Sequence, residues 1–304
     1  MRTIILFALV GSVGLLGLTG CGASSVPVST AALGEPVSRA DLLEALANPV
    51  AVNVEKRTVA HWAVPLSGLL NLEHPKAQAA GIEDREEPID LFVYVVRHPE
   101  QGTFIIDSGV SALFLEPDGN PNLSGVVSSA MGMEKLEVLE TTASIADTIG
   151  GVDGVFLTHI HIDHIMGLND LPADTAVYIG PGDASAKAGL NALTQGTTDR
   201  LLGTQNQLRE WPYGNAKILD IFGDGSVFAI HSPGHTPGAT AYLVNSVDGA
   251  HLMLGDATHT RWGWENGVEP GSYSADIPTS AESLAWLKEL SAQVPAMTVH
   301  PGHQ

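Results

Sequence analysis

The sequence predicts a layered α/β or α+β body, built from short strands with a few helices between them. Of its 304 residues, 44% are hydrophobic and 16% are charged, which is typical of a chain that folds around a core. Apolar runs of strand length recur along the chain, and several segments between them carry the boundary signals of helices. Residues 35–304 contain no internal repeat and no linker, which indicates one domain.

The first residues have the pattern of a processing signal. A positive start precedes an apolar and glycine run over residues 4–18, shorter than the ~20 residues of a membrane-spanning helix. The run ends at Leu18-Thr19-Gly20-Cys21, which resembles the lipobox of bacterial lipoproteins. This resemblance implies that residues 1–20 are a signal peptide and that Cys21 carries a lipid, which anchors an exported protein to the bacterial cell envelope. An ordinary signal peptide or an uncleaved anchor is the alternative. Residues 21–34, rich in Ser, Ala, Val and Pro, are expected to form a flexible tether.

The body then shows helix and strand signals in succession. Ser38 begins a capped short helix through residues 42–46, and residues 142–149 are a second helical segment. Thr279 and Glu282 have the spacing of a capping box that opens a helix through Leu290. The polar, glycine-containing segment 182–214 is a candidate lid. Strands are predicted at 91–97 and 103–107, which form a hairpin, and at 155–158, 176–179, 217–222, 227–231, 241–244, 251–254 and 297–300.

The charge and the cysteine content exclude several classes of function. The chain has 14 Lys+Arg and 34 Asp+Glu, a formal net charge of −20. Since nucleic-acid affinity comes mostly from Lys and Arg, we expect no DNA or RNA partner. A single cysteine excludes a disulfide scaffold and a thiolate zinc site.

The residues that carry chemistry are concentrated in the string Thr158-His159-Ile160-His161-Ile162-Asp163-His164. Alternation after the predicted strand places His159 and His161 on one side, and Asp163 and His164 lie at the turn into the next helix. Imidazole nitrogens with a carboxylate suit Zn²⁺ or a similar divalent ion. A tract of solvated histidines is the alternative, and the apolar neighbours argue against it.

This string resembles the H-x-H-x-D-H signature of the metallo-β-lactamase superfamily, and the rest of the family pattern follows in order. The segment 232–238 resembles its Gly-His segment, the segment 252–257 its strand that ends in an aspartate, and residues 300–303 its C-terminal Pro-Gly-His turn. Asp107 resembles an early aspartate that supports the metal cluster. The resemblance covers nearly all of residues 90–304 and implies an αββα sandwich, with metals at one edge between the two sheets.

The resemblance also implies the ligands. His159, His161 and His235 would hold a first metal ion, Asp163, His164 and His303 would hold a second, and Asp256 would bridge them. The implied cofactor is therefore two divalent ions per chain, for which Zn²⁺ is the best fit. We prefer His303 to His300 as the last ligand because the family histidine follows Pro-Gly, although the chain ends one residue later.

Within the superfamily the sequence is most similar to the N-acyl homoserine lactonase group, whose opening hairpin resembles residues 93–109. This implies a small-molecule substrate and a hydrolase in which a metal-bridging hydroxide attacks a lactone or ester carbonyl, while Asp163 relays a proton to the leaving oxygen. The group carries a tyrosine three residues after the bridging aspartate, where this chain has His259. A histidine can also donate a hydrogen bond to a developing oxyanion, and the alternative is that His259 points away.

Other functions stay open at this point. A cysteine-free two-zinc β-lactamase would suit an exported protein, although such enzymes use no bridging aspartate. Another ester or phosphodiester hydrolase would use the same pair of metals, and a surface lipoprotein would keep the fold only for binding. Trp262 and Trp264 either line an apolar acyl pocket or pack in the core.

Overall fold

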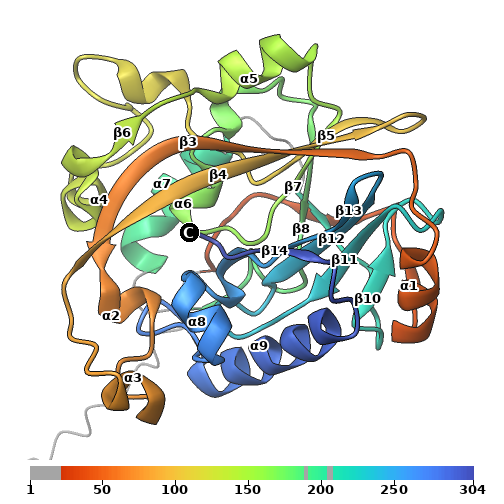
Figure 1. The fold of residues 1–304 in the computed structure, drawn as a ribbon. Coiled ribbons are helices and arrows are strands. Elements are labelled where there is room, and N and C mark those ends of the chain that lie inside the picture. The colour runs from red at the N-terminus through yellow and green to blue at the C-terminus, as the bar shows by residue number, and fades with distance from the viewer. Residues whose placement is uncertain (1–21, 188–190, 204–207) are drawn as a thin grey trace, which may run out of the picture.

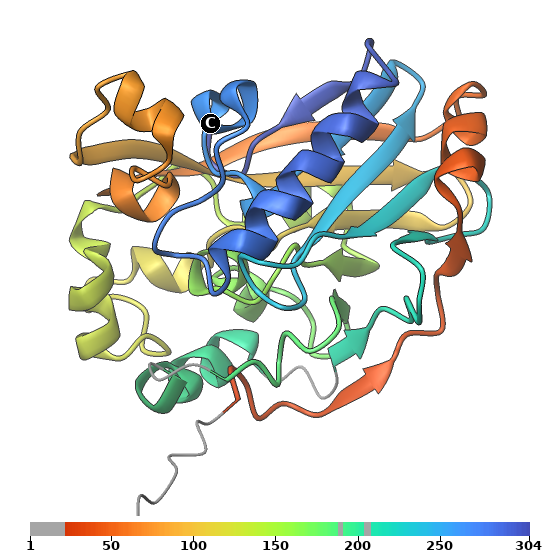
Figure 2. The same ribbon diagram turned by 90° about the horizontal axis from the view of Figure 1, so that it is seen from below.

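The computed structural model describes residues 22–187, 191–203 and 208–304. Its strands form two mixed sheets that face each other, and helices cover the outer face of each sheet (Figures 1 and 2). Within the described residues, the order of the eight-stranded sheet is β1-β9-β8-β7-β5-β4-β3-β6 and that of the six-stranded sheet is β14-β13-β12-β11-β10-β2. This is the αββα sandwich that the family resemblance implies.

The strands are β1 Val28–Thr30, β2 Glu35–Val37, β3 Asn53–Pro65, β4 Glu86–His98, β5 Gly102–Ile106, β6 Glu137–Val138, β7 Gly154–Phe156, β8 Ala176–Ile179, β9 Leu208–Glu210, β10 Ile218–Asp220, β11 Val227–His231, β12 Thr240–Ser246, β13 Gly249–Met253 and β14 Thr298–His300. The α-helices are α1 Arg39–Leu46, α2 Leu66–Leu69, α3 Pro75–Ala79, α4 Gly125–Met131, α5 Thr142–Ile149, α6 Ile162–Ile165, α7 Asn191–Leu202, α8 Arg261–Asn266 and α9 Ile277–Ala292. Four 3₁₀ turns are described: η1 Ala112–Leu115, η2 Met133–Lys135, η3 Leu168–Asp170 and η4 Gly255–Ala257.

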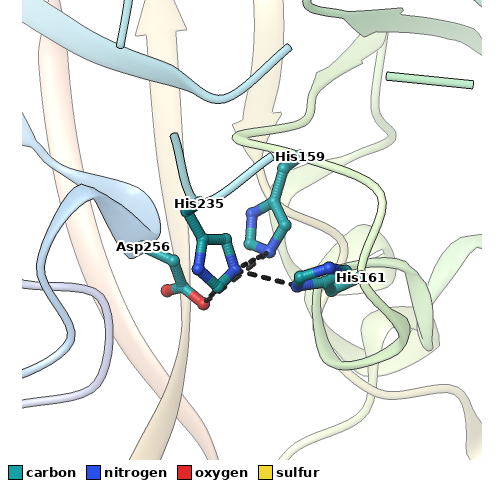
Figure 3. Close-up of side chains that lie close together, drawn as sticks. All are labelled: His159, His161, His235 and Asp256. Carbon is teal, nitrogen blue, oxygen red and sulfur yellow. Dashed lines mark hydrogen bonds and ion pairs between the residues drawn. The ribbon is translucent and has the colours of Figure 1, made fainter. Parts of the chain in front are cut away.

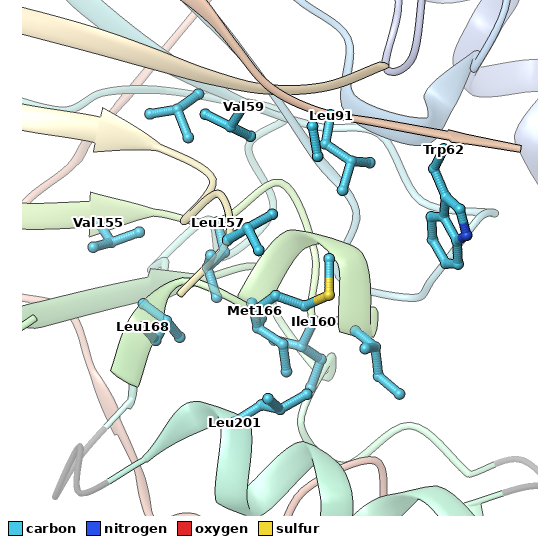
Figure 4. Close-up of a cluster of buried hydrophobic side chains, with 14 of the residues drawn as sticks. Val59, Trp62, Leu91, Val155, Leu157, Ile160, Met166, Leu168 and Leu201 are labelled. Atoms are coloured by element: carbon cyan, nitrogen blue, oxygen red, sulfur yellow. The ribbon is translucent and has the colours of Figure 1, made fainter. Parts of the chain in front are cut away.

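Strand alternation divides the core into layers. Along β4, Val93 and Val95 belong to the cluster under α4–α7, part of which Figure 4 shows. Tyr94 and Val96 point the other way, into the layer between the two sheets. A third cluster, with Leu287 and other residues of α9, lies on the outer face of the second sheet. Both faces of these strands are buried, which explains why they read as continuous apolar runs.

Most predicted elements form, and the differences have local causes. The capping box of Ser38 and Asp41 opens α1, and the predicted hairpin is the pair β4–β5. The start of α9 was predicted wrongly: the helix begins at Ile277, because Asp276 caps it by accepting from the N–H of Thr279. The long strand β3 had no clear signal in the sequence, and its place next to the edge strand β6 comes from pairing with both β4 and β6.

The segments expected to be a tether and a lid both contain regular structure where the chain is described. Within residues 22–34, the expected tether, Ser24 and Ser25 hydrogen-bond to Asp199 of α7, and β1 pairs with β9. The candidate lid 182–214 contains α7 and β9. Residues 1–20 and Cys21, the predicted signal peptide and lipid site, lie outside the described residues. In the described part of the chain, none of the helices combines the length and apolarity needed to span a bilayer.

Candidate metal centre

The candidate residues follow strands that end at one edge of the sandwich. In the first sheet, β5 and β7 run parallel and are followed by Asp107 and by the histidine string 158–164. In the second sheet, β13 and β14 also run parallel, and Asp256 and His303 come after them. His235 lies in the loop that follows β11. Residues far apart in the chain therefore meet at one place between the sheets.

The first group of side chains consists of His159, His161, His235 and Asp256 (Figure 3). Nε2 of His235 lies 3.1 Å from Nε2 of His159 and 2.8 Å from Nδ1 of His161. Oδ2 of Asp256 lies 3.3 Å from Nε2 of His235 and 3.7 Å from Nε2 of His159. One ligand atom from each residue lies within 4.8 Å of the other three, so the four side chains converge on one point.

The second group consists of Asp163, His164, His303 and again Asp256. Oδ2 of Asp163 lies 3.4 Å from Nε2 of His164 and 3.4 Å from Nε2 of His303. Oδ2 of Asp256 lies 3.5 Å from Nε2 of His164, and Oδ1 of Asp256 lies 3.4 Å from Nε2 of His303. The seven ligands that the resemblance implies are thus brought together in two groups that share one carboxylate.

These donor atoms fit divalent cations. In a tetrahedral site with zinc–nitrogen bonds of ~2.0–2.1 Å, ligand atoms lie about 3.3 Å apart, and those of the first group are 2.8 to 3.7 Å apart. Among the described residues, Nε2 of His164 and Oδ1 of Asp256 are buried without a hydrogen-bond partner. Buried polar atoms without partners are costly, and cations at the two points of convergence would satisfy both.

The environment also shifts the pKa values of these side chains. Burial lowers the pKa of His159 and of His235 well below the usual value, so both rings are neutral at pH 7. Burial by itself would raise the pKa of Asp256, but the surrounding imidazoles hold it well below its ordinary value. Burial would likewise raise the pKa of Asp163, but His164 and His303 outweigh burial and lower it. Neutral imidazoles and ionised carboxylates are the forms that bind metal ions. In the second group, burial is outweighed by the surrounding carboxylates, which raise the pKa of His164 well above its usual value and also raise that of His303. A metal ion at this group therefore competes with protons for these two rings.

Asp107 holds the ring of His164, a member of the second group, by a hydrogen bond to Nδ1. It has a left-handed backbone conformation with φ of 58°, which aspartate tolerates better than most residues do. Its carboxylate accepts hydrogen bonds from the N–H of Thr158 at 2.8 Å and from Nδ1 of His164 at 2.8 Å. Since a carboxylate can only accept, the proton of a neutral His164 ring lies on Nδ1. Its Nε2 lone pair is then free to bind a metal ion.

His303 is held firmly although it is close to the end of the chain. Its Nδ1 donates to the carbonyl of Asp90 at 3.0 Å, and its backbone N–H donates to the carbonyl of His259 at 3.0 Å. The carbonyl of His303 in turn accepts from the N–H of Asp90 at 3.1 Å. His300 instead places Nε2 3.2 Å from Nδ1 of His251. Of these two histidines, His303 is therefore the one that joins the centre.

His259, three residues after Asp256, faces the centre. Its Nε2 lies 3.1 Å from Oδ2 of Asp256, and its Nδ1 donates to the carbonyl of Leu69 at 3.0 Å. The residue is 1% exposed, and its ring stacks nearly parallel to that of His303. Because Nδ1 carries the proton that is bonded to Leu69, a neutral His259 presents a lone pair at Nε2.

One residue in contact with the centre was not among the candidates from the sequence. Oγ of Ser274 lies 3.2 Å from Nδ1 of His235, and the N–H of Ala275 donates to the carbonyl of His235. No motif marks Ser274, which belongs to the loop before α9 and reaches the centre only through the tertiary fold.

The two tryptophans of α8 do not form one wall. Trp262 packs against the core cluster on the outer face of the first sheet, whereas Trp264 packs against the cluster on the outer face of the second. Trp264 also lies under the Lys288 ammonium, 4.8 Å from its ring centroid. A shared acyl pocket made by both rings is therefore not formed.

Comparison with known proteins agrees with this geometry. Residues 90–303 match the model of the metallo-beta-lactamase superfamily. The N-acyl homoserine lactonase AttM of Azorhizobium caulinodans is 29% identical over 234 residues, which span 72% of this chain and 83% of that protein. A hydroxyacylglutathione hydrolase of Shewanella loihica is 31% identical over 149 residues, spanning 48% of this chain and 47% of that protein.

Solved structures show the same fold. The crystal structure of a quorum-quenching N-acyl homoserine lactone lactonase has a TM-score of 0.60 at 15% identity and covers 84% of this chain and 93% of its own. AidC, a dizinc quorum-quenching lactonase, has a TM-score of 0.55 at 15% identity and covers 89% of this chain and 90% of its own. With the family match over 90–303, these observations show that the chain belongs to the metallo-beta-lactamase superfamily.

Proposed function

We propose that this protein is a dinuclear metal-dependent hydrolase that opens the ring of N-acyl homoserine lactones or related lactones. The observation that carries the proposal is the pair of four-residue groups that share Asp256. The choice of substrate is supported by relatives named N-acyl homoserine lactonase, which align with this chain over 83% of their own length. The proposed ions are two Zn²⁺, because the ligands are imidazoles and carboxylates and include no thiolate.

The two groups assign the ligands of each ion. His159, His161 and His235 would hold the first ion, Asp163, His164 and His303 the second, and Asp256 both. When bound, two divalent ions supply an activated water and polarise the carbonyl of the substrate. The protein contributes the fixed positions of seven ligand side chains and the low-dielectric surroundings that strengthen their interaction with charge.

Asp163 and His259 are the proposed catalytic residues. The Asp163 side chain is 16% exposed, more than the neighbouring His303, so its carboxylate can accept a proton from the attacking water and pass it to the leaving oxygen of the substrate. The Nδ1 proton of His259 is bonded to Leu69, so this ring donates a hydrogen bond to a carbonyl oxygen from Nε2 only when it carries both protons.

A substrate panel tests this function. Zinc-loaded protein is assayed with N-acyl homoserine lactones of several chain lengths, a chromogenic cephalosporin and a phosphodiester, with His161→Ala as the inactive control. We expect ring opening of lactones and no turnover of the cephalosporin. Cephalosporin turnover without lactone turnover would replace the lactonase with a β-lactamase, and bound zinc without any turnover would favour a binding protein.

We further propose that the protein is exported and anchored to the cell envelope by a lipid on Cys21. The proposal rests on the lipobox-like sequence and on an apolar leader too short to span a membrane. Mass spectrometry of the mature N-terminal peptide is expected to show an acylated cysteine, and Cys21→Ser is expected to abolish the modification. An unmodified N-terminus at another residue would refute the anchor.

A further inference from the structure

Asp183 lies outside both groups but contacts the two loops that carry the three histidines of the first group. It follows β8 and is 1% exposed. Its Oδ2 accepts a hydrogen bond at 2.9 Å from the N–H of Ile160, the residue between the first two histidines of the string. Its Oδ1 accepts one at 3.2 Å from the N–H of Gly238, three residues after His235. The carboxylate of Asp183 therefore links two loops that are far apart in the sequence.

The backbone around Asp183 is shaped for this contact. A Cβ on Gly180 would overlap the carbonyl oxygen of Gly238, and a Cβ on Gly238 would lie 2.7 Å from Cβ of Asp183. Burial raises the pKa of Asp183 to about 6, so the carboxylate is ionised at pH 7 but in an unfavourable place. A buried charge is destabilising unless hydrogen bonds compensate for it, and the two N–H groups provide that compensation.

We propose that Asp183 is a positioning residue that holds the His159–His161 loop and the His235 loop at the separation that the first metal ion requires. An ionised carboxylate has two acceptor oxygens, and each loop occupies one of them. The second group takes no residue from the His235 loop, so the effect of Asp183 falls mainly on the first ion. Since this group is a metal site only if the proposed function is correct, the inference rests on that function.

Asp183→Asn tests the inference because asparagine has nearly the same shape but one acceptor oxygen. Its NH₂ group would face one of the two backbone N–H donors, so one loop loses its hydrogen bond. The matched control is Asp220→Asn. Asp220 is also buried, and it accepts from the N–H groups of Gly223 and Gly225 in the turn between β10 and β11, at the other end of β11 from His235.

The measurement is zinc binding, by competition with a chromogenic chelator and by elemental analysis after dialysis. For Asp183→Asn we expect one of the two zinc affinities to fall about 10–100-fold, the range for outer contacts of metal ligands, and the other to change much less. Asp183→Glu, which keeps both oxygens on a longer arm, is expected to lie between the parent and Asp183→Asn, and Asp220→Asn is expected to match the parent.

The outcomes separate this inference from the proposed function. Equal losses at both sites, or no loss at either, would overturn the positioning role. A parent protein that binds no zinc would refute the metal centre itself. If the variants do not fold, amide hydrogen exchange of the metal-free parent decides the question: we expect the Ile160 and Gly238 amides to be protected to the same extent, and exchange of either at the rate of an unprotected amide would overturn the role.

Discussion

Replacing Asp107 by asparagine should weaken metal binding by changing the protonation of one histidine. The side chain accepts from the N–H of Thr158 and from Nδ1 of His164, each at 2.8 Å. In the variant, the amide oxygen keeps the bond to Thr158, and the NH₂ group then donates to Nδ1 of His164. The ring proton moves to Nε2, the atom that faces Asp163 and Asp256. Asparagine also tolerates the left-handed backbone of residue 107, so the substitution does not strain the backbone.

The magnitude follows from the role of such outer contacts. Removal of the partner of a ligating histidine costs about 10–100-fold in metal affinity, or about 1.4–2.7 kcal/mol. The assay is a competition titration of zinc against a chromogenic chelator. Asp224→Asn is the matched control, because Asp224 lies 2.8 Å from Nε2 of the buried His98, a pair that belongs to neither metal group. Unchanged zinc affinity in Asp107→Asn, or an equal loss in Asp224→Asn, would refute the reasoning.

Three further changes have defined outcomes. His161→Ala removes a ligand of the first group, so elemental analysis should find close to two metal ions per parent chain and clearly fewer in the variant. Burial lowers the pKa of His300 from 6.5 to about 4. As the pH falls, the unfolded chain therefore binds a proton at this histidine before the folded protein does. The free energy of unfolding should fall by up to about 3 kcal/mol between pH 6.5 and 4. Urea unfolding of His300→Gln should show a shallower acid slope, and an unchanged slope would contradict this assignment. In Gly302→Ala the new Cβ would overlap Oδ1 of Asp256, so the free energy of unfolding should fall by about 1–3 kcal/mol and zinc affinity should also fall. Gly125→Ala is the control: its Cβ would have no atom within 4 Å, and it should lower neither quantity.

Sequence patterns correctly predicted the elements that are stabilised by residues close together in the chain. The capping box at Ser38 and the hairpin of β4 and β5 depend on residues near each other in the chain, and both form. The start of α9 was predicted too late in the sequence, because Asp276 caps the helix and accepts from the N–H of Thr279. The strand β3 was missed because its position depends on pairing with strands remote in sequence.

The seven residues that converge at the candidate centre could be predicted because metal chemistry restricts the choice of side chains. Few side chains bind a divalent ion, and four of the seven candidates stand within the string 159–164. Their order along the chain, with His235, Asp256 and His303 after later strands, identified the family without coordinates. The roles of Ser274 and Asp183 carried no such signal, because a serine or an aspartate in a loop has many ordinary uses.

The sequence by itself therefore determined which residues can coordinate metal ions and which chemistry they support. The tertiary structure alone decided how they meet: which nitrogen of each ring faces inward, that His259 turns toward Asp256, and that one carboxylate holds two ligand loops. The physical reason is distance along the chain. The contact between His235 and His159 joins residues 76 positions apart, and such contacts form only after two sheets have packed face to face and aligned the ends of their strands.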